Sequence, residues 1–226
     1  VTDYVPRGDG GRVSLLADRL VAVVDRRRAV ERAGALERIN DVIRDVNRAL
    51  VYATTRSELD ERVCEIISRS DPYRFAWIGE VDGETGRVEP LASAGAADGY
   101  LDAIEITTGE GATAAGPTGE AVRTGETQVT QHISANPDFE PWRAEALERG
   151  FESSAAIPLT YEGTSYGVLN LYADRAAAFD DRELDLLERL GDDVAHALYR
   201  IDVRDRQQRA ERIIDNLPVG VYRARR

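Results

Sequence analysis

The stretch from Ser154 to Tyr172, SAAIPLTYEGTSYGVLNLY, decides the fold of this 226-residue chain. Two mainly apolar runs, 154–160 and 165–172, flank the segment Tyr-Glu-Gly-Thr at 161–164, which has the length and composition of a hairpin loop. The stretch therefore predicts two antiparallel strands joined by a short turn. We expect this hairpin to form the centre of a sheet.

Further strands are expected on the N-terminal side of this hairpin. Residues 75–81 and 87–94 flank Asp82–Gly86, a polar loop with two glycines that again suits a hairpin. A short strand over 127–130 precedes the central hairpin. Together these runs predict an antiparallel central sheet of about five to six strands.

Apolar residues at helical spacing predict helices before and after the strands. Stripes over 39–50 and 59–67 indicate two helices before the first strand. After Phe179-Asp180-Asp181, apolar positions recur every three or four residues from Leu184 to Ile201, and no helix breaker follows before Pro218. The expected fold class is α+β, with helices on both sides of the sheet and long N- and C-terminal helices.

Two regions of the chain differ from these regular elements. The segment 95–150 mixes loops with short helices at 100–104, 119–123 and 141–149. The end of the long helix, 204–212, is almost wholly polar. Its composition is equally compatible with a solvent-exposed connector and with the edge of a two-helix dimer interface.

Charge is the most unusual bulk property of the chain. It carries 41 acidic and 29 basic residues, a formal net charge of −12, and every basic residue is arginine. A nucleic-acid surface normally gathers positive charge, so no binding of nucleic acid through this chain is expected. Dense carboxylates suit an ordinary acidic protein or, as we favour, the protein of a halophile in screening salt.

The sequence also lacks several features that would point to other classes of protein. No apolar run approaches the roughly 20 residues that cross a bilayer, and the N-terminus does not resemble a signal peptide. The single Cys64 excludes an internal disulfide and a metal site built on two thiolates. We expect a cytoplasmic protein with no membrane association, no metal and no cofactor that the sequence identifies. The absence of methionine is one sign of a fragment of a longer protein.

Four segments resemble the GAF domain family in their order and spacing. Residues 75–78 resemble its first strand, and 119–126, GEAVRTGE, resembles its helix-turn signature. Residues 154–159 resemble a later strand, and 166–172 followed by 179–184 resembles the last strand and the helix after it. The resemblance assigns a GAF domain to residues 36–200.

Both flanks resemble pieces of other signalling modules. The run from Thr2 to Arg7 with the helix after it resembles the last strand and helix of a receiver domain, over residues 1–35. The run from Arg212 to Tyr222 is similar to the opening of a PAS domain, so 201–226 is expected to be a signalling-helix linker and the start of that domain. The resemblance implies a piece of a two-component type sensor, of the kind found among archaeal histidine kinases and transcriptional regulators.

The resemblance implies no catalytic residue in this chain. GAF domains that reduce free methionine sulfoxide use several cysteines, whereas Cys64 is single and lies on the apolar face of a predicted helix. No cysteine lies between His132 and Gly150, where a bilin is often attached. His196 lacks the sequence pattern of a kinase phosphoacceptor. We therefore expect no enzyme.

A ligand pocket beneath the middle segment is the site that the family resemblance implies. Aromatic rings with a few polar groups suit a small planar ligand, although the same rings could simply fill the core. The candidate residues from the middle segment and the sheet are Tyr100, Thr118, His132, Phe139, Trp142, Phe151, Ser153, Asn170 and Tyr172.

The function expected from the sequence is sensory. A small molecule or a partner would shift the packing of the middle segment, and the terminal helices would relay that change within a homodimer. The expected dimer interface consists of Ile39, Val46, Leu187, Val194, Leu198 and Ile201. The alternative is a ligand-free dimerisation or spacer domain with a filled pocket.

Overall fold

The central hairpin of the chain forms where the sequence predicts it. The structure is a computed structural model that describes residues 22–23, 26, 34, 37–96 and 99–215. Strands β4 (Ser153–Tyr161) and β5 (Thr164–Ala173) pair antiparallel as far as Tyr161 opposite Thr164. Only Glu162 and Gly163 form the turn, with φ of 49° and 76°, the left-handed values that two-residue hairpin turns require.

Three further strands complete an antiparallel five-stranded sheet. They are β1 (Tyr73–Val81), β2 (Val88–Gly95) and β3 (Gln128–Thr130), and the order across the sheet is β2-β1-β5-β4-β3. The hairpin β4–β5 therefore lies inside the sheet, and β2 and β3 form its edges. The predicted α+β class and the predicted antiparallel sheet are confirmed.

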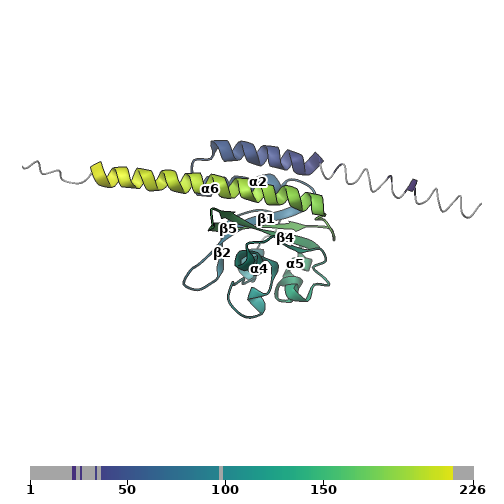
Figure 1. Ribbon diagram of the computed structural model, residues 1–226. Helices are drawn as coiled ribbons and strands as arrows, with labels where there is room; N and C mark the ends of the chain where they lie inside the picture. Colours follow the sequence, from purple (N-terminus) through teal and green to yellow (C-terminus); the bar gives the residue numbers. More distant parts are fainter. Residues whose placement is uncertain (1–21, 24–25, 27–33, 35–36, 97–98, 216–226) are drawn as a thin grey trace, which may run out of the picture.

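Long helices cover one face of this sheet. Helices α2 (Arg56–Ser68) and α6 (Asp181–Asp215), the latter 35 residues long, pack on it, and a helix over 37–52 lies on their outer side (Figure 1). Helix α6 continues through Gly191, which lies close to β4. A Cβ at this position would stand 2.7 Å from Cγ2 of Ile157. The glycine thus allows close packing of helix on strand.

Short elements cover the opposite face, as Figure 1 shows for α4 and α5. The predicted helix over 141–149 is divided in the structure. A 3₁₀ helix, η2, ends at Trp142, and α5 begins at the next residue, because Pro141 lies inside η2. The elements on this face are α3 (Tyr100–Ala103), η1 (Ala112–Ala114), α4 (Pro117–Thr124), η2 (Pro137–Trp142) and α5 (Arg143–Glu148).

The sheet separates two buried clusters, which we call the first and the second core. The first core joins the long helices to the sheet through mainly aliphatic side chains, among them Val46, Val63, Leu169 and Leu187. The second core lies under the short elements. Its members are Phe75, Trp77, Val88, Tyr100, Ile106, Ala121, Ile133, Phe139, Trp142, Ala146, Phe151, Ala156, Val168 and Tyr172.

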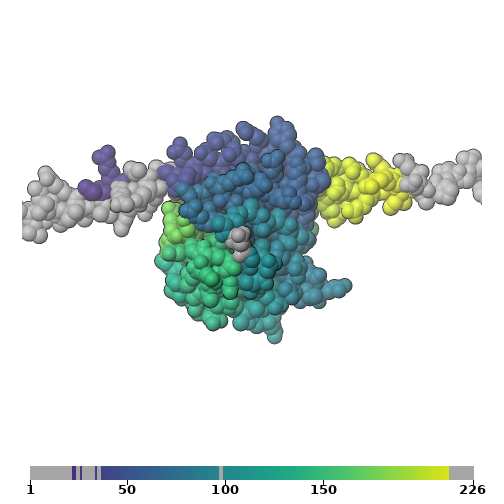
Figure 2. All heavy atoms as spheres, turned by 180° about the vertical axis from the view of Figure 1, so that it is seen from behind, coloured from purple at the N-terminus to yellow at the C-terminus, as the bar shows by residue number. Residues whose placement is uncertain are grey.

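The far end of α6 stands apart from both cores. The yellow end of this helix extends beyond the rest of the domain in Figures 1 and 2, and the side chains from 206 to 213 are exposed. The strand and nearly all of the helix of the expected receiver piece, and the expected PAS residues from 216 onward, lie outside the described residues. Both flanking assignments therefore remain predictions.

Candidate functional site

The second core is the site that gathers most of the predicted ligand residues. Alternate residues of each central strand point to this face, so that Trp77 lies beside Asn170 and Asn170 lies beside Ala156 in the register of β1, β5 and β4. The small side chain of Ala156 leaves room for its larger neighbours. Helix α4 lies across these strands and carries Thr118 over Asn170.

Aromatic rings fill most of this core. The rings of Phe75 and Phe151 stack with centroids 5.9 Å apart, and Tyr172 lies 4.9 Å from Phe151. Tyr100 meets Phe151 edge-on at 5.5 Å and Tyr172 edge-on at 5.4 Å. Contacts of this kind contribute dispersion and quadrupole attraction beyond simple burial.

A few polar atoms lie among these rings. The hydroxyl of Thr118 donates to Oδ1 of Asn170 over 2.7 Å, and both residues are buried. Oγ of Ser154 is buried without a hydrogen-bond partner among the described residues, whereas Nε1 of Trp77, which meets no partner at ideal geometry, interacts with the Tyr172 hydroxyl. A buried polar atom without a partner costs roughly 1–3 kcal/mol, so a group that supplied one would be bound favourably.

Among the described residues, no charged side chain is buried in the second core. Burial raises the pKa of the Tyr100 and Tyr172 phenols, so both stay neutral at physiological pH. The guanidinium of Arg149 lies outside, 5.6 Å from the centre of the Tyr100 ring. The interactions that this cluster offers are hydrogen bonds and ring stacking.

The structure brings together seven of the nine predicted ligand residues. Tyr100, Thr118, Phe139, Trp142, Phe151, Asn170 and Tyr172 are all buried in or beside the second core. His132 is exposed at the surface. Ser153 is buried beside the loop after β5, where its hydroxyl donates to the carbonyl of Arg175 over 2.8 Å.

Sequence reasoning missed two polar members of this site, Trp77 and Ser154. The strand alternation carried a usable signal, because Phe75 and Trp77 must share one face of β1. Knowledge that β1 pairs with β5 was also needed to place Trp77 beside Asn170. That pairing joins residues far apart in the chain.

The six residues predicted for the dimer interface are buried within the single chain that the structure describes. Ile39, Val46, Leu187, Val194, Leu198 and Ile201 all belong to the first core, with exposed fractions between 0% and 7%. An apolar stripe on a helix can face a partner chain or its own sheet. Here it faces the sheet, because the sheet is wide enough to cover it. These side chains are unavailable to a second copy.

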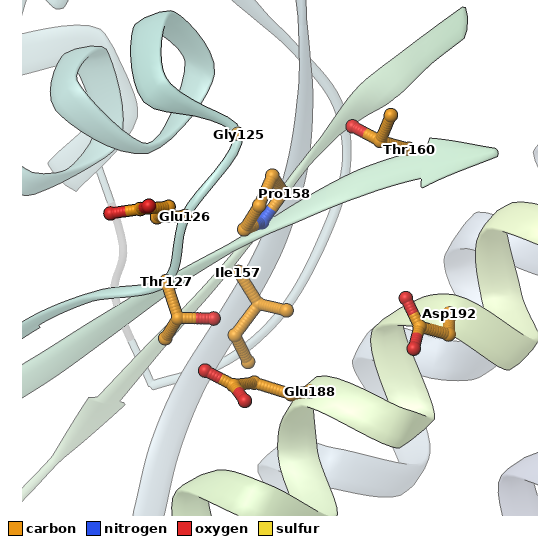
Figure 3. A pocket seen from close by; sticks show the side chains of 8 residues that line it. All are labelled: Gly125, Glu126, Thr127, Ile157, Pro158, Thr160, Glu188 and Asp192. Atoms are coloured by element: carbon orange, nitrogen blue, oxygen red, sulfur yellow. The ribbon is translucent and has the colours of Figure 1, made fainter. Parts of the chain in front are cut away.

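A surface pocket of about 500 Å³ lies away from the second core, at the edge of the sheet (Figure 3). Its walls come from the turn after α4, from β4 and from α6. Three carboxylates border it, those of Glu126, Glu188 and Asp192. Within the described part of the chain, no group of three or more His, Cys, Asp or Glu residues is arranged to hold a metal ion.

Neither the cysteine nor the histidines form a reactive group among the described residues. Cys64 is fully buried, its Sγ lies 3.7 Å from the carbonyl of Ala92, and burial raises the pKa of the thiol well above its ordinary value. A thiol that stays protonated is a poor nucleophile. His196 is exposed on α6, and its ring stacks on Tyr161 at 4.8 Å.

A search of the described helices for a membrane span gave a negative result: none combines the length and the apolar character that crossing a bilayer requires.

An antiparallel sheet with long helices on one side and short elements enclosing a core on the other is a layered α+β fold. The sequence profile described as "GAF domain" matches residues 53–198. The chain belongs to the GAF domain family, which confirms the resemblance seen in the sequence.

One relative and two solved structures illustrate the range of similar proteins. The bacterioopsin transcriptional activator of Halobacterium salinarum is 29% identical over 160 residues, 69% of this chain and 22% of that protein. The GAF domain of a phosphoenolpyruvate-protein phosphotransferase from Coxiella burnetii has a TM-score of 0.61 at 15% identity, over 75% of this chain and 97% of that one.

The second structure is an enzyme. The free methionine-R-sulfoxide reductase of Neisseria meningitidis, solved with its substrate, has a TM-score of 0.59 at 18% identity, over 71% of this chain and 88% of that chain. At such identity the likeness shows the fold alone. Because the chain matches less than a quarter of the length of the haloarchaeal activator, the activity of any larger protein is a matter for proposal.

Proposed function

We propose that this chain is a sensory GAF domain of a haloarchaeal regulatory protein, a transcriptional regulator or a histidine kinase. In this proposal it binds a small molecule in the second core and relays the change through the terminal helices. It turns over no substrate, acts in the cytoplasm and contacts no nucleic acid itself. The similarity to a haloarchaeal transcriptional activator supports this setting.

The observation that carries the proposal is the polar cluster inside the second core. Ser154 buries a hydroxyl without a partner among the described residues, and Nε1 of Trp77 has only a non-ideal contact with the Tyr172 hydroxyl, beside the hydrogen-bonded pair of Thr118 and Asn170. A planar ligand with hydrogen-bonding groups would satisfy these atoms and replace some of the ring contacts. Only the form of the domain that admits the ligand would gain this energy, which is what a conformational switch requires.

Extraction of bound ligand from purified protein tests the proposal. Protein prepared in high salt is denatured, and released compounds are identified by mass spectrometry against a protein-free control. We expect a stoichiometric compound from the wild type and its loss from the double variant Thr118→Val with Asn170→Leu. The variant His132→Ala, altered at the exposed predicted residue, is the matched control and should retain it.

A ligand-free spacer and dimerisation domain is the second candidate, and the tight packing of the aromatic rings favours it. The rings of Phe75, Tyr100, Phe151 and Tyr172 already contact one another closely. This candidate predicts that no preparation yields a compound. The same extraction thus separates the two functions.

Homodimerisation through the terminal helices is part of both candidates, but it needs a surface other than the buried stripe. A groove of about 340 Å³ lies between the helix over 37–52 and α6. Val51 borders it with 72% of its side chain exposed, and Tyr52 beside it is 73% exposed. We propose that these outward faces meet in the dimer.

Light scattering on charged variants tests this placement. The pair Val51→Asp with Tyr52→Asp should convert dimers to monomers, because charges would replace apolar contacts at the centre of the interface. Leu91→Asp, on the edge strand β2 and 45% exposed, is the control and should stay dimeric. A dimer that survives the first pair of substitutions contradicts the placement.

A further inference from the structure

The residue after β3, Gln131, is bonded to the segment that leads into α6. Its side-chain Nε2 donates to the carbonyl of Phe179, and the amide of Phe179 donates back to Oε1 over 3.4 Å. The backbone carbonyl of Gln131 also accepts from the amide of Ala177 over 2.8 Å. One residue thus makes three hydrogen bonds to a segment 46 to 48 positions away.

The segment held by Gln131 is closely joined to the first turn of α6. Phe179 is buried and stacks on Tyr73, with ring centroids 6.0 Å apart. The Tyr73 hydroxyl donates to the carboxylate of Glu183, which is buried in the first turn of the helix. The Asp180 carboxylate accepts from the Glu183 amide over 2.9 Å, as a helix cap does. A displacement of Phe179 would therefore move the start of α6.

The neighbours of Gln131 belong to the opposite side of the sheet. Thr130 is buried opposite Ser154 in the register of β3 and β4. Ile133 is fully buried in the second core, and its amide donates to the carbonyl of Glu152 over 2.9 Å. Within four residues the chain thus contacts both the second core and, through Gln131, the start of α6.

We infer that Gln131 is the positioning residue that couples the packing of the second core to the first turns of α6. A change in the packing of the second core around Ile133 shifts the segment 130–133. The two hydrogen bonds of the Gln131 carboxamide transmit this shift to Phe179. The inference rests on the proposed relay through α6 for its biological meaning. The coupling itself requires no ligand, so a failed ligand search would leave it standing.

Hydrogen exchange on the ligand-free chain, read by mass spectrometry on peptides covering 174–190, tests the coupling. Gln131→Ala removes both side-chain bonds and should speed exchange at Phe179, Glu183 and Leu184 by about five- to tenfold, in line with the loss of one or two net hydrogen bonds. Gln128→Ala is the matched control. It removes the same side chain from the same segment, where its amide makes only a local 3.4 Å bond to the Glu126 carbonyl.

A double-mutant cycle separates coupling from simple stabilisation of the helix start. Ile133→Val, a mild change in the second core, should speed exchange over 181–187 in the wild-type background and have no added effect in the Gln131→Ala background. Equal effects of Ile133→Val in both backgrounds overturn the inference, as does unchanged exchange in folded Gln131→Ala. If Gln131→Ala does not fold, Gln131→Glu takes its place under the same criteria, because it keeps the acceptor for the Phe179 amide.

Discussion

The two cores of this domain share one sheet but differ in kind. The first core is mainly aliphatic and is covered by three long helices. Half of the side chains of the second core are aromatic, and it is covered by helices of eight residues or fewer. From this contrast we expect the first core to maintain the fold and the second core to change its packing more easily.

The contrast has a physical basis in the covering elements. A long helix is held by many contacts along its length, so that one local change is resisted by the rest. Short helices joined by loops have fewer contacts each and open at lower cost. Substitutions on the two faces should therefore differ in the size of their effects.

The largest effect is expected from a charge placed in the first core. Leu187→Asp introduces a carboxylate at a position with no solvent exposure and no partner, which should cost more than about 4 kcal/mol and unfold the domain. Circular dichroism during a urea titration would measure the loss. Arg189→Asp, at an exposed position of the same helix, is the control and should change stability by less than about 1 kcal/mol. A folded Leu187→Asp protein that is merely monomeric would restore the original dimer prediction.

A pH-dependent effect is expected at Asp60, the buried carboxylate at the border of the first core. Its Oδ2 accepts from Nε of Arg56 over 3.2 Å, whereas its Oδ1 has no hydrogen-bond partner within the described residues. Burial raises the pKa of Asp60 from 3.8 to about 6, against the opposing charge of Arg56. Between these values the folded state keeps a proton that the unfolded state has lost, so stability falls as pH rises and the loss is complete above about pH 7.

Asp60→Asn removes this penalty. The raised pKa of Asp60 costs the wild type about 3 kcal/mol of stability above pH 7. Because Arg56 loses its partner in the variant, we expect the free energy of unfolding at pH 8 to rise by only about 1–2 kcal/mol. At pH 4, where most of this penalty is absent and the lost Arg56 contact remains, the variant should be about 1 kcal/mol less stable than the wild type. Urea titrations at both pH values provide the measurement, and a variant that is less stable at pH 8 would contradict the proposed cause.

In the second core, the hydrogen bond between Thr118 and Asn170 should show strong non-additivity. Thr118→Val leaves the Asn170 carboxamide oxygen buried without its donor and should cost about 1–2 kcal/mol. Adding Asn170→Leu replaces both partners by apolar groups and should restore most of that stability. Thermal unfolding of the two single variants and the double variant measures the interaction, and additive losses would argue against a dry, closed cluster.

The smallest effect is expected on the outer surface of α6. His196→Ala removes a ring that stacks on Tyr161 but remains exposed to solvent, so the expected loss is below about 1 kcal/mol. The same thermal unfolding assay applies. A loss as large as that of Thr118→Val would show that this surface contributes to the fold as much as the second core does.

Several structural features were predictable because their signals are local. The hairpin 153–173 follows from two apolar runs around Glu162-Gly163, and α6 follows from the three- and four-residue spacing of its apolar positions. The sequence predicted one helix over 141–149 but not its division into η2 and α5. A proline inside a 3₁₀ turn produces nearly the same local pattern as a proline at a helix start.

The site was predictable only in outline. Seven of the nine candidate residues share one cluster, since the family resemblance indicated the correct sheet face and covering segment. His132, a candidate at the border of the pocket, is exposed, and position along a loop does not reveal which way a side chain points. Trp77 and Ser154 were missed because their relevance depends on which side chains lie beside them, which only three-dimensional packing determines.

By itself the sequence determined the α+β class, the antiparallel strands, the helical spacing and the GAF family, since each depends on residues close together in the chain or on motifs in a fixed order. The tertiary structure alone decided that the apolar stripe of α6 faces its own sheet, that Asn170 lies between Trp77 and Ala156, and that Gln131 reaches Phe179. The physical reason is the same in each case. These contacts join segments that are far apart in the chain. An apolar or polar side chain could be buried or hydrogen-bonded in several places, and only the folded structure determines which neighbour it has.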